Sequence, residues 1–425
     1  MAEFYCEVFQ NEFLPEGGTD VHAVVAVTCA GAGAAGQAPG ADVAEIIIVD
    51  TSGSMQGDRI GAAKAGAAAA IDQILDGTWF AVIAGTDGAT RAFPYSNATS
   101  PMVRMEPGAR AAAKQAVSQL VAGGGTAMGT WLRLAARLFD VVPAAQRHAI
   151  LLTDGKNQSE TTVALQTSIR EVTGRFQCDC RGIGADWDVN EVRQIAQALL
   201  GTVDIIPAPH ELAGAFAAVM RQAMSRGVAD AQVRVWAPQG ARVLFVRQVS
   251  PQVEDLTGRR VDVNPLTGGY PTGAWSDETR EYHVAVRLAA RPVGADQAAA
   301  RVQLAVGNEV KTQGLIKAVW SADEALTARI NPAVAHYTGQ TELATAIQEG
   351  LAAKAAGMDG EATAKLGRAV QLAEETGNDD VTAKLRKVVD IEDAGAGTVR
   401  LRRDVTRVDE MMLDTSSTKT TRVRR

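Results

Sequence analysis

A carboxylate and two hydroxyl side chains follow a short apolar run near position 50. Residues 46–49 are all Ile or Val, Asp50 comes next, and Ser52 and Ser54 follow at alternating positions. Such a run is typical of a buried strand, and ligands bind where the strands of a parallel sheet end. One carboxylate and two hydroxyls are hard oxygen ligands that suit Mg²⁺ or Mn²⁺. The spacing therefore predicts a metal site, used for binding rather than for chemistry.

Two later segments place further oxygen ligands in the same context. Thr126 follows three glycines at 123–125 and precedes a helical pattern, and Asp154 ends a second apolar strand over 148–153. The carboxyl ends of parallel strands meet at one edge of a sheet, so we expect these side chains to converge. Mg²⁺ prefers six oxygens and keeps some water, which leaves a position for an oxygen from outside. The predicted ligands are Asp50, Ser52, Ser54, Thr126 and Asp154.

These residues resemble the metal-ion-dependent adhesion site of the von Willebrand factor A domain, also called the integrin I-like domain. That motif reads Asp-x-Ser-x-Ser, then a Thr after a Gly-rich turn, then an Asp at the end of the next core strand, and all five positions are present here. The resemblance covers roughly residues 40–226 and is to the bacterial intracellular type. It implies that the hydroxyls contact the metal, that the aspartates act mostly through water, and that a Glu or Asp of a partner protein completes the shell. The implied metal is Mg²⁺, with Mn²⁺ or Ca²⁺ as alternatives.

Other interpretations of the motif are less specific or need residues that are absent from it. An Asp-Thr-Ser sequence after a strand is often only a turn and a helix N-cap. A catalytic metal site would normally gather more carboxylates, and no Lys, His or second acid stands beside the motif as a nucleophile or base. The haloacid dehalogenase pattern would need an Asp at position 52, which is Ser. We therefore expect that the protein is not an enzyme.

Composition and charge exclude several classes of protein. The chain has 425 residues, 46% hydrophobic and 21% charged, which is typical of a globular protein with several domains. Its net charge of −7 argues against a nucleic-acid-binding protein. The first residues lack the features of a signal peptide, and no apolar run is long enough to span a membrane. Cys178 and Cys180 read as buried thiols, so we expect a cytoplasmic protein.

Alternating patterns predict the domain organisation. Residues 39–227 alternate strands with helices, which predicts an α/β domain with a doubly wound, mostly parallel sheet. The strands are expected at 45–50, 79–84, 147–153, 177–183 and 203–206. Residues 1–38 and 228–320 alternate polar and apolar residues, which predicts one β-sandwich into which the α/β domain is inserted. Residues 321–394 have helical spacing and predict a small bundle.

The last segment, residues 395–425, is basic and rich in Ser and Thr, and we expect it to be disordered. The simplest interpretation is a solvated tail against an acidic body. Threonines beside basic residues also resemble the sites of bacterial Ser/Thr kinases, whose products forkhead-associated domains bind. The candidate phosphorylation sites are Thr415, Thr418, Thr420 and Thr421.

The sequence thus predicts a metal-dependent protein-interaction module that captures an acidic residue of a partner protein, with possible regulation through the C-terminal threonines. One alternative is an adaptor subunit of an AAA+ ATPase or a chelatase-like complex, since other von Willebrand A subunits serve such machines and this chain has no P-loop of its own. A metal-dependent hydrolase is the other.

Overall fold

The computed structural model describes residues 2–35, 42–95, 98 and 100–423. The chain divides into two compact units. One comprises Ala32–Ala229, and the other combines Met1–Gly31 with Asp230–Arg425. The first unit is therefore an insertion in the second along the chain. The predicted domain boundary between residues 38 and 39 lies outside the described residues.

The unit 32–229 is built on a seven-stranded sheet in the order β10-β9-β8-β4-β5-β6, with β7 beside β5. The five strands β4, β5, β8, β9 and β10 are parallel, as predicted, whereas β6 and β7 form an antiparallel edge that was not predicted. The bounds are β4 (Val43–Asp50), β5 (Trp79–Gly85), β6 (Ala89–Phe93), β7 (Val103–Arg104), β8 (Gln146–Thr153), β9 (Gln177–Ile183) and β10 (Val203–Ile206).

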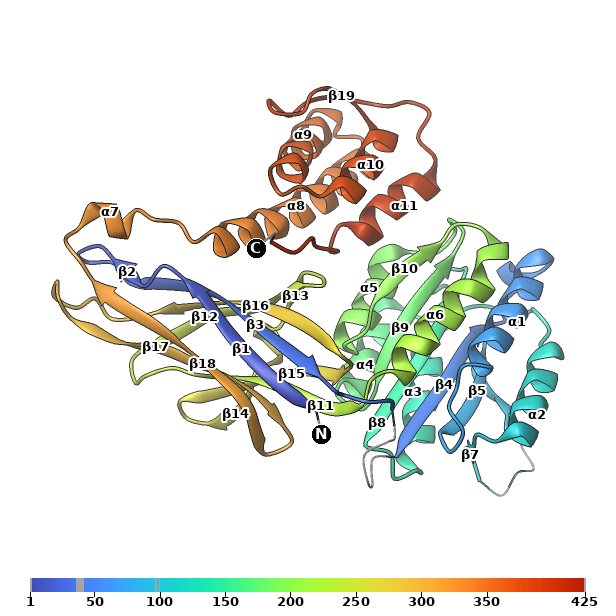
Figure 1. Cartoon of the computed structure of the whole chain (residues 1–425). Coiled ribbons are helices and arrows are strands. Elements are labelled where there is room, and N and C mark those ends of the chain that lie inside the picture. The colour runs from blue at the N-terminus through green and yellow to red at the C-terminus, as the bar shows by residue number, and fades with distance from the viewer. Residues whose placement is uncertain (1, 36–41, 96–97, 99, 424–425) are drawn as a thin grey trace. The chain divides into compact units, whose positions relative to one another are not determined.

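Helices cover both faces of this sheet, which explains why the central strands are apolar throughout (Figure 1). Residues 46–49 of β4 and 149–152 of β8 are fully buried. One face packs against α1, α2 and α6, and the other is covered by α3, α4 and α5. Their bounds are α1 (Asp58–Ile71), α2 (Pro107–Ser118), α3 (Met128–Asp140), α4 (Thr162–Val172), α5 (Val189–Ala198) and α6 (Leu212–Met224).

The second unit contains two sheets formed by the segments that flank the insertion. The five-stranded sheet has the order β1-β3-β16-β12-β13, and the six-stranded sheet has the order β14-β15-β11-β17-β18-β2. The two sheets contact each other where Gly314 of β18 lies against Val8 of β1. The bounds are β1 (Glu3–Gln10), β2 (Phe13–Leu14), β3 (Asp20–Ala30), β11 (Val228–Trp236), β12 (Arg242–Ser250), β13 (Glu254–Asp255), β14 (Val261–Asn264), β15 (Thr267–Trp275), β16 (Glu278–Arg287), β17 (Asp296–Val306) and β18 (Glu309–Trp320).

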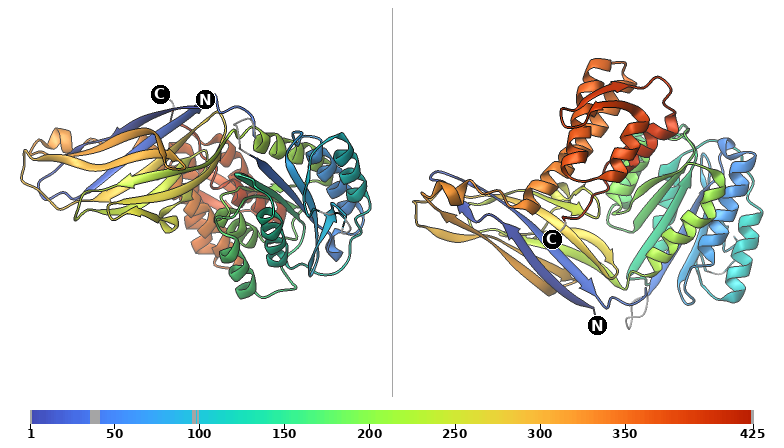
Figure 2. Two further views of the ribbon diagram at one scale, coloured as in Figure 1. Left: turned by 90° about the horizontal axis from the view of Figure 1, so that it is seen from below. Right: turned by 45° about the horizontal axis from the view of Figure 1, so that its top comes forward.

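A helical region completes this unit (Figure 2). It consists of α7 (Glu324–Thr327), α8 (Pro332–Ala355), α9 (Asp359–Glu375), α10 (Asp379–Val388), the hairpin β19 (Val389–Asp393) and β20 (Thr398–Leu401), and α11 (Arg407–Ser416). The core of the region includes Val399 and Leu413 beside side chains of α8, α9 and α10. The packed helical core therefore extends past residue 394, where the sequence pattern had suggested that it ends.

The prediction of a disordered tail is wrong for the described part of residues 395–425. Residues 407–416 form α11, in which Met411 and Leu413 are buried. Thr415 and Ser416 can also be buried, because their hydroxyls donate to the carbonyls of Met411 (2.9 Å) and Leu413 (3.0 Å). Composition alone underestimated the segment, since small hydroxyl side chains satisfied by their own helix enter a core at low cost.

The residues after α11 run along the five-stranded sheet and the helices. The amide of Val253 donates to the carbonyl of Thr418 (2.7 Å), and the amide of Thr420 donates to the carbonyl of Pro251 (3.1 Å). The Thr420 hydroxyl donates to the carbonyl of Val249 (2.7 Å), and the Thr421 hydroxyl accepts from Gln340 (3.1 Å). Val423 packs in an apolar cluster with side chains of α8 and the sheet. Of the four candidate phosphorylation sites, Thr415 is thus buried and the other three are partly buried.

Candidate metal centre

Asp50 ends β4 with its carboxylate fully buried. One oxygen accepts the amide of Ser52 (2.8 Å), and the other accepts the hydroxyl of Thr153 (2.6 Å), which ends β8. Burial raises the pKa of Asp50 and the charge of Asp154 adds to this, while the hydrogen bonds from Ser52 and Thr153 oppose it. The carboxylate forms no ion pair with any described basic side chain. It is therefore well placed to gain from a nearby cation.

The two serines of the motif connect Asp50 to Asp154. The hydroxyl oxygens of Ser52 and Ser54 lie 3.0 Å apart, and Ser54 donates to Oδ1 of Asp154 (2.6 Å). Ser52 and Asp154 are buried, whereas Ser54 is exposed. The cluster therefore reaches from the interior of the sheet edge to the surface, as a site that binds a ligand from outside requires.

Thr126 is held beside the serines by the glycine turn that precedes it. The amide of Gly53 donates to the carbonyl of Gly124 (2.9 Å), which joins the two loops. The amide of Thr126 donates to the Ser159 hydroxyl (3.1 Å), and the amide of Ser159 donates back to the Thr126 carbonyl (2.8 Å). A Cβ on Gly125 would lie 1.9 Å from that hydroxyl oxygen, so the close approach of the loops requires glycine there.

The position of Gly155 tests whether these residues fit a metal ion. A Cβ built on Gly155 would lie 3.1 Å from Ser54 Oγ, 3.4 Å from Thr126 Oγ1 and 3.9 Å from Ser52 Oγ. Three hydroxyl oxygens from two loops therefore lie within 4 Å of one point, and the absence of a side chain at Gly155 keeps that point open. Asp154, which precedes Gly155, hydrogen-bonds to Ser54. The structure thus brings the five predicted residues together, in an arrangement that fits a hard divalent cation.

The candidate centre depends on hydroxyls as well as carboxylates. Across the described ranges, no group of three or more His, Cys, Asp and Glu side chains is arranged to hold a metal. Two carboxylates and three hydroxyls make a weakly charged oxygen set, which is suited to Mg²⁺ or Mn²⁺ rather than to a soft metal.

Sequence reasoning missed a basic residue at this site. Arg59, in the first turn of α1, donates to Oδ2 of Asp154 and to Oδ2 of Asp186, each at 2.8 Å. Asp186 follows β9, which lies next to β8 in the sheet. The position of Asp186 after a strand end was the sequence signal that could have indicated this contact. The contact joins residues 95 and 127 positions apart, which no local pattern reveals.

A buried network of charges lies near the start of the same strands. His148 of β8 hydrogen-bonds to Glu45 of β4 (2.8 Å) and to Asp179 of β9 (2.9 Å), and Arg226 pairs with Asp179 (3.3 Å). Burial opposes the charged imidazolium, but the charge of Glu45 and the hydrogen bonds to both acids prevail and raise the pKa of His148 to about 9. His148 and the two acids occupy the amino-terminal halves of their strands, whereas the metal centre lies at the carboxyl ends, so the network is separate from that centre.

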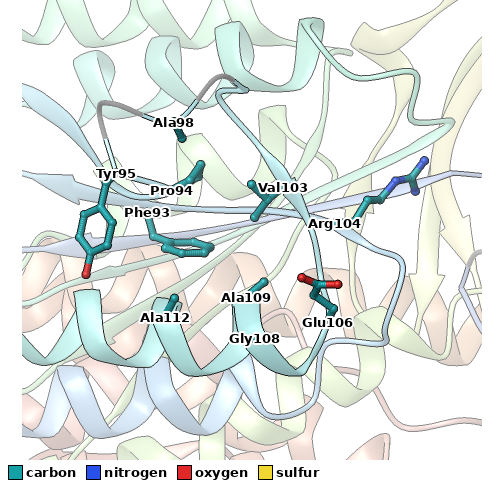
Figure 3. Close-up of a pocket in the computed structure, with 10 residues that line it drawn as sticks. All are labelled: Phe93, Pro94, Tyr95, Ala98, Val103, Arg104, Glu106, Gly108, Ala109 and Ala112. Carbon is teal, nitrogen blue, oxygen red and sulfur yellow. The ribbon is translucent and has the colours of Figure 1, made fainter.

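A hollow of about 470 Å³ lies at the edge of the sheet near β6 and α2 (Figure 3). Its lining includes Phe93, Tyr95 and Val103, with Arg104 and Glu106 as its charged members. Arg104 is already engaged, because it donates to both oxygens of Asp42 and stacks on Trp79. The hollow therefore offers apolar surface without a set of groups arranged for chemistry, and the metal centre is the stronger candidate.

Comparisons with known proteins identify two domains in the chain. The family model of the von Willebrand factor type A domain matches residues 44–205, and that of the von Willebrand factor type A C-terminal domain matches residues 371–417. The second match includes part of the segment that the sequence had suggested to be disordered. Neither model extends over the two sheets of the flanking unit.

Three similar proteins span a range of sequence identity to this chain. A solved structure, von Willebrand factor type A from Catenulispora acidiphila, is 48% identical, with a TM-score of 0.93 over 99% of this chain and 97% of that one. The ArnB paralog VWA2 from Sulfolobus acidocaldarius is 14% identical, with a TM-score of 0.60 over 98% of each chain, and shares the fold. Uncharacterized protein sll0103 from Synechocystis is 27% identical over 221 residues, and the match spans 49% of that protein's length.

Among the described residues, no helix is both long and apolar enough to cross a membrane. The fold, the two matched domains and the near full-length similarity to a related structure lead to one assignment. The chain belongs to the von Willebrand factor type A family.

Proposed function

We propose that this protein is a metal-dependent protein-interaction module, in which Mg²⁺ bound by Asp50, Ser52, Ser54, Thr126 and Asp154 captures a Glu or Asp of a partner protein. Domains of this family are commonly metal-dependent interaction modules rather than enzymes. The observation that carries the proposal is the set of three hydroxyl oxygens around the open position at Gly155, beside a carboxylate on each of two strand ends. A bound divalent cation would supply the positive charge that attracts a carboxylate.

The residues of this chain have separate roles in the proposed site. Asp50 and Asp154 provide negative charge from within the sheet edge, where burial strengthens their interaction with a cation. Ser52, Ser54 and Thr126 provide neutral oxygens, which hold a cation without cancelling its charge. The exposure of Ser54 leaves the site open to a side chain from outside. A cation held mainly by neutral oxygens keeps its attraction for an external carboxylate.

The matched test compares Asp50→Asn with Asp72→Asn, measured by isothermal titration with Mn²⁺ and by affinity purification from the native cell. Asp50→Asn removes the buried charge without changing the shape of the side chain, so we expect both metal binding and metal-dependent partner binding to be lost. Asp72 directly follows α1 and pairs with Lys114 at the surface, so its variant should behave as wild type. EDTA should reproduce the Asp50→Asn result, and added Mg²⁺ should reverse EDTA alone. Capture of the same partner by Asp50→Asn in EDTA would refute the proposal.

Two finer proposals depend on other residues. The four cysteines are unpaired, which supports a reducing compartment such as the cytoplasm as the place of action. Phosphorylation of the C-terminal threonines, with recognition by a forkhead-associated domain, would first require this ordered segment to leave the sheet and the helices. An intact-mass measurement on protein purified from its own cell tests whether any phosphate is present.

A further inference from the structure

Arg59 places a permanent positive charge against a ligand of the candidate metal centre. Its guanidinium donates to Oδ2 of Asp154, while Oδ1 of the same carboxylate accepts the hydroxyl of Ser54. The Asp154 side chain is fully buried and that of Arg59 is one-third exposed. Both oxygens of Asp154 are therefore engaged, one by the hydroxyl cluster and one by a fixed cation.

The second contact of Arg59 keeps the guanidinium in this position. The other terminal nitrogen donates to Oδ2 of Asp186, whose side chain is 64% exposed. An exposed ion pair of this kind contributes little to stability by itself. Its geometric effect is larger, because it tethers the end of the Arg59 side chain to the loop after β9 and so orients the first nitrogen toward Asp154.

Charge at the site decides what this arrangement does to metal binding. Asp50 and Asp154 supply two negative charges to a divalent cation, and the guanidinium offsets one of them. A cation at the hydroxyl cluster and the guanidinium share Asp154, so they repel each other at short range and with limited screening by water. An incoming carboxylate is attracted by both.

We propose that Arg59 is an internal competitor of the metal, which lowers the affinity of the centre for a divalent cation by sharing Asp154 with it. This inference rests on the proposed metal-binding function and adds a regulatory residue to it. A site weakened in this way binds its cation more tightly when a partner carboxylate offsets the charge of Arg59. By thermodynamic linkage, metal and partner then strengthen each other's binding.

The test is a Mn²⁺ titration of the full chain, followed by electron paramagnetic resonance, for wild type, Arg59→Gln, Arg59→Lys and Arg104→Gln. Arg59→Gln should bind Mn²⁺ about tenfold or more tightly, since removal of one nearby unit charge is worth at least that factor. Arg59→Lys keeps the charge and should remain near wild type. Arg104 forms an equally short ion pair with Asp42 in the same unit, so its variant is the matched control and should not change the dissociation constant.

A second measurement separates competition from a merely structural role. In metal-free buffer, Arg59→Gln should melt at a lower temperature than wild type, because Asp154 loses its ion pair with the guanidinium. Saturating Mn²⁺ should raise the melting temperature of Arg59→Gln by more than it raises that of wild type. If Arg59→Gln bound Mn²⁺ no more tightly than wild type, the proposed role of Arg59 would be overturned. The proposed function would still stand if wild type bound Mn²⁺ and Asp50→Asn did not. Absence of Mn²⁺ binding from wild type and every Arg59 variant would overturn both.

Discussion

The ionised His148 makes the stability of the unit 32–229 depend on pH. Its pKa is raised to about 9 in the folded chain from an ordinary value of 6.5, so the stability it contributes is complete below pH 6.5 and is lost as pH rises through 9. Between pH 7 and 8 the folded state holds nearly one more proton than the unfolded chain, and the free energy of unfolding should fall by about 1 kcal/mol per pH unit. Urea-dependent hydrogen exchange, measured on peptides from β4 and β8, provides this slope.

The control for this prediction is His148→Gln, which cannot take up the proton. Its absolute stability will be lower, because Glu45 and Asp179 lose the imidazolium between them, but its slope between pH 7 and 8 should be near zero. His22 and His283 do not interfere with this measurement. Burial is the main cause that lowers the pKa of each, so neither holds an extra proton in the folded chain between pH 7 and 8, and both belong to the other unit. A wild-type stability that does not change over this range would show that His148 is neutral in the folded chain.

The residues of the metal centre and of the His148 network show which parts of a site the sequence can predict and which it cannot. Asp50, Ser52 and Ser54 were predictable because a local pattern places them at a strand end, and Thr126 and Asp154 follow the same rule. Arg59 was not, because its position next to Asp154 depends on how α1 packs beside the end of β8. The pairing of His148 with Glu45 depends in the same way on strand order and register. Patterns along the chain therefore identify candidate ligands, whereas the groups that adjust them emerge from packing.

Among the elements, the C-terminal segment gives the clearest test. Ending the chain after Ser417 removes the hydrogen bonds of Thr418 and Thr420 to the five-stranded sheet and those of Thr421 to the helices, together with the apolar contact of Val423. At roughly 1 kcal/mol for each lost hydrogen bond, the attachment of α8 to the sheet should weaken by a few kcal/mol. Hydrogen exchange should accelerate in residues 249–254 and in the first turns of α8.

A full-length substitution variant controls for part of the charge that the truncation removes. Arg422→Gln removes one of the four basic residues that follow Ser417, together with the hydrogen bond from its guanidinium to the carbonyl of Thr279. It keeps the hydrogen bonds of Thr418, Thr420 and Thr421, so exchange in residues 249–254 should change much less than after truncation. If the truncated chain exchanged at the wild-type rate, the segment would be a passive tail, as its composition had suggested. The element-level lesson is that apolar periodicity predicts the five parallel strands well. It does not detect segments held by backbone and hydroxyl hydrogen bonds to distant residues, such as 418–423 or the short edge strands β6 and β7.

At the scale of the whole molecule, the division into two units predicts which unit metal binding stabilises. A cation that binds only the folded unit 32–229 stabilises it by about 2.7 kcal/mol at a concentration one hundred times the dissociation constant. The other unit supplies none of the five proposed ligands, so its stability should not change. Hydrogen exchange of the full chain with and without Mg²⁺ should therefore slow throughout β4, β5, β8 and β9 and remain the same in β12, β16 and β17. The Asp50→Asn variant should show no slowing in any strand. Equal slowing of exchange in both units of wild type would mean either that the cation binds elsewhere or that the two units unfold together. The same experiment on Asp50→Asn distinguishes these cases, because slowing would persist in this variant only if the cation binds elsewhere.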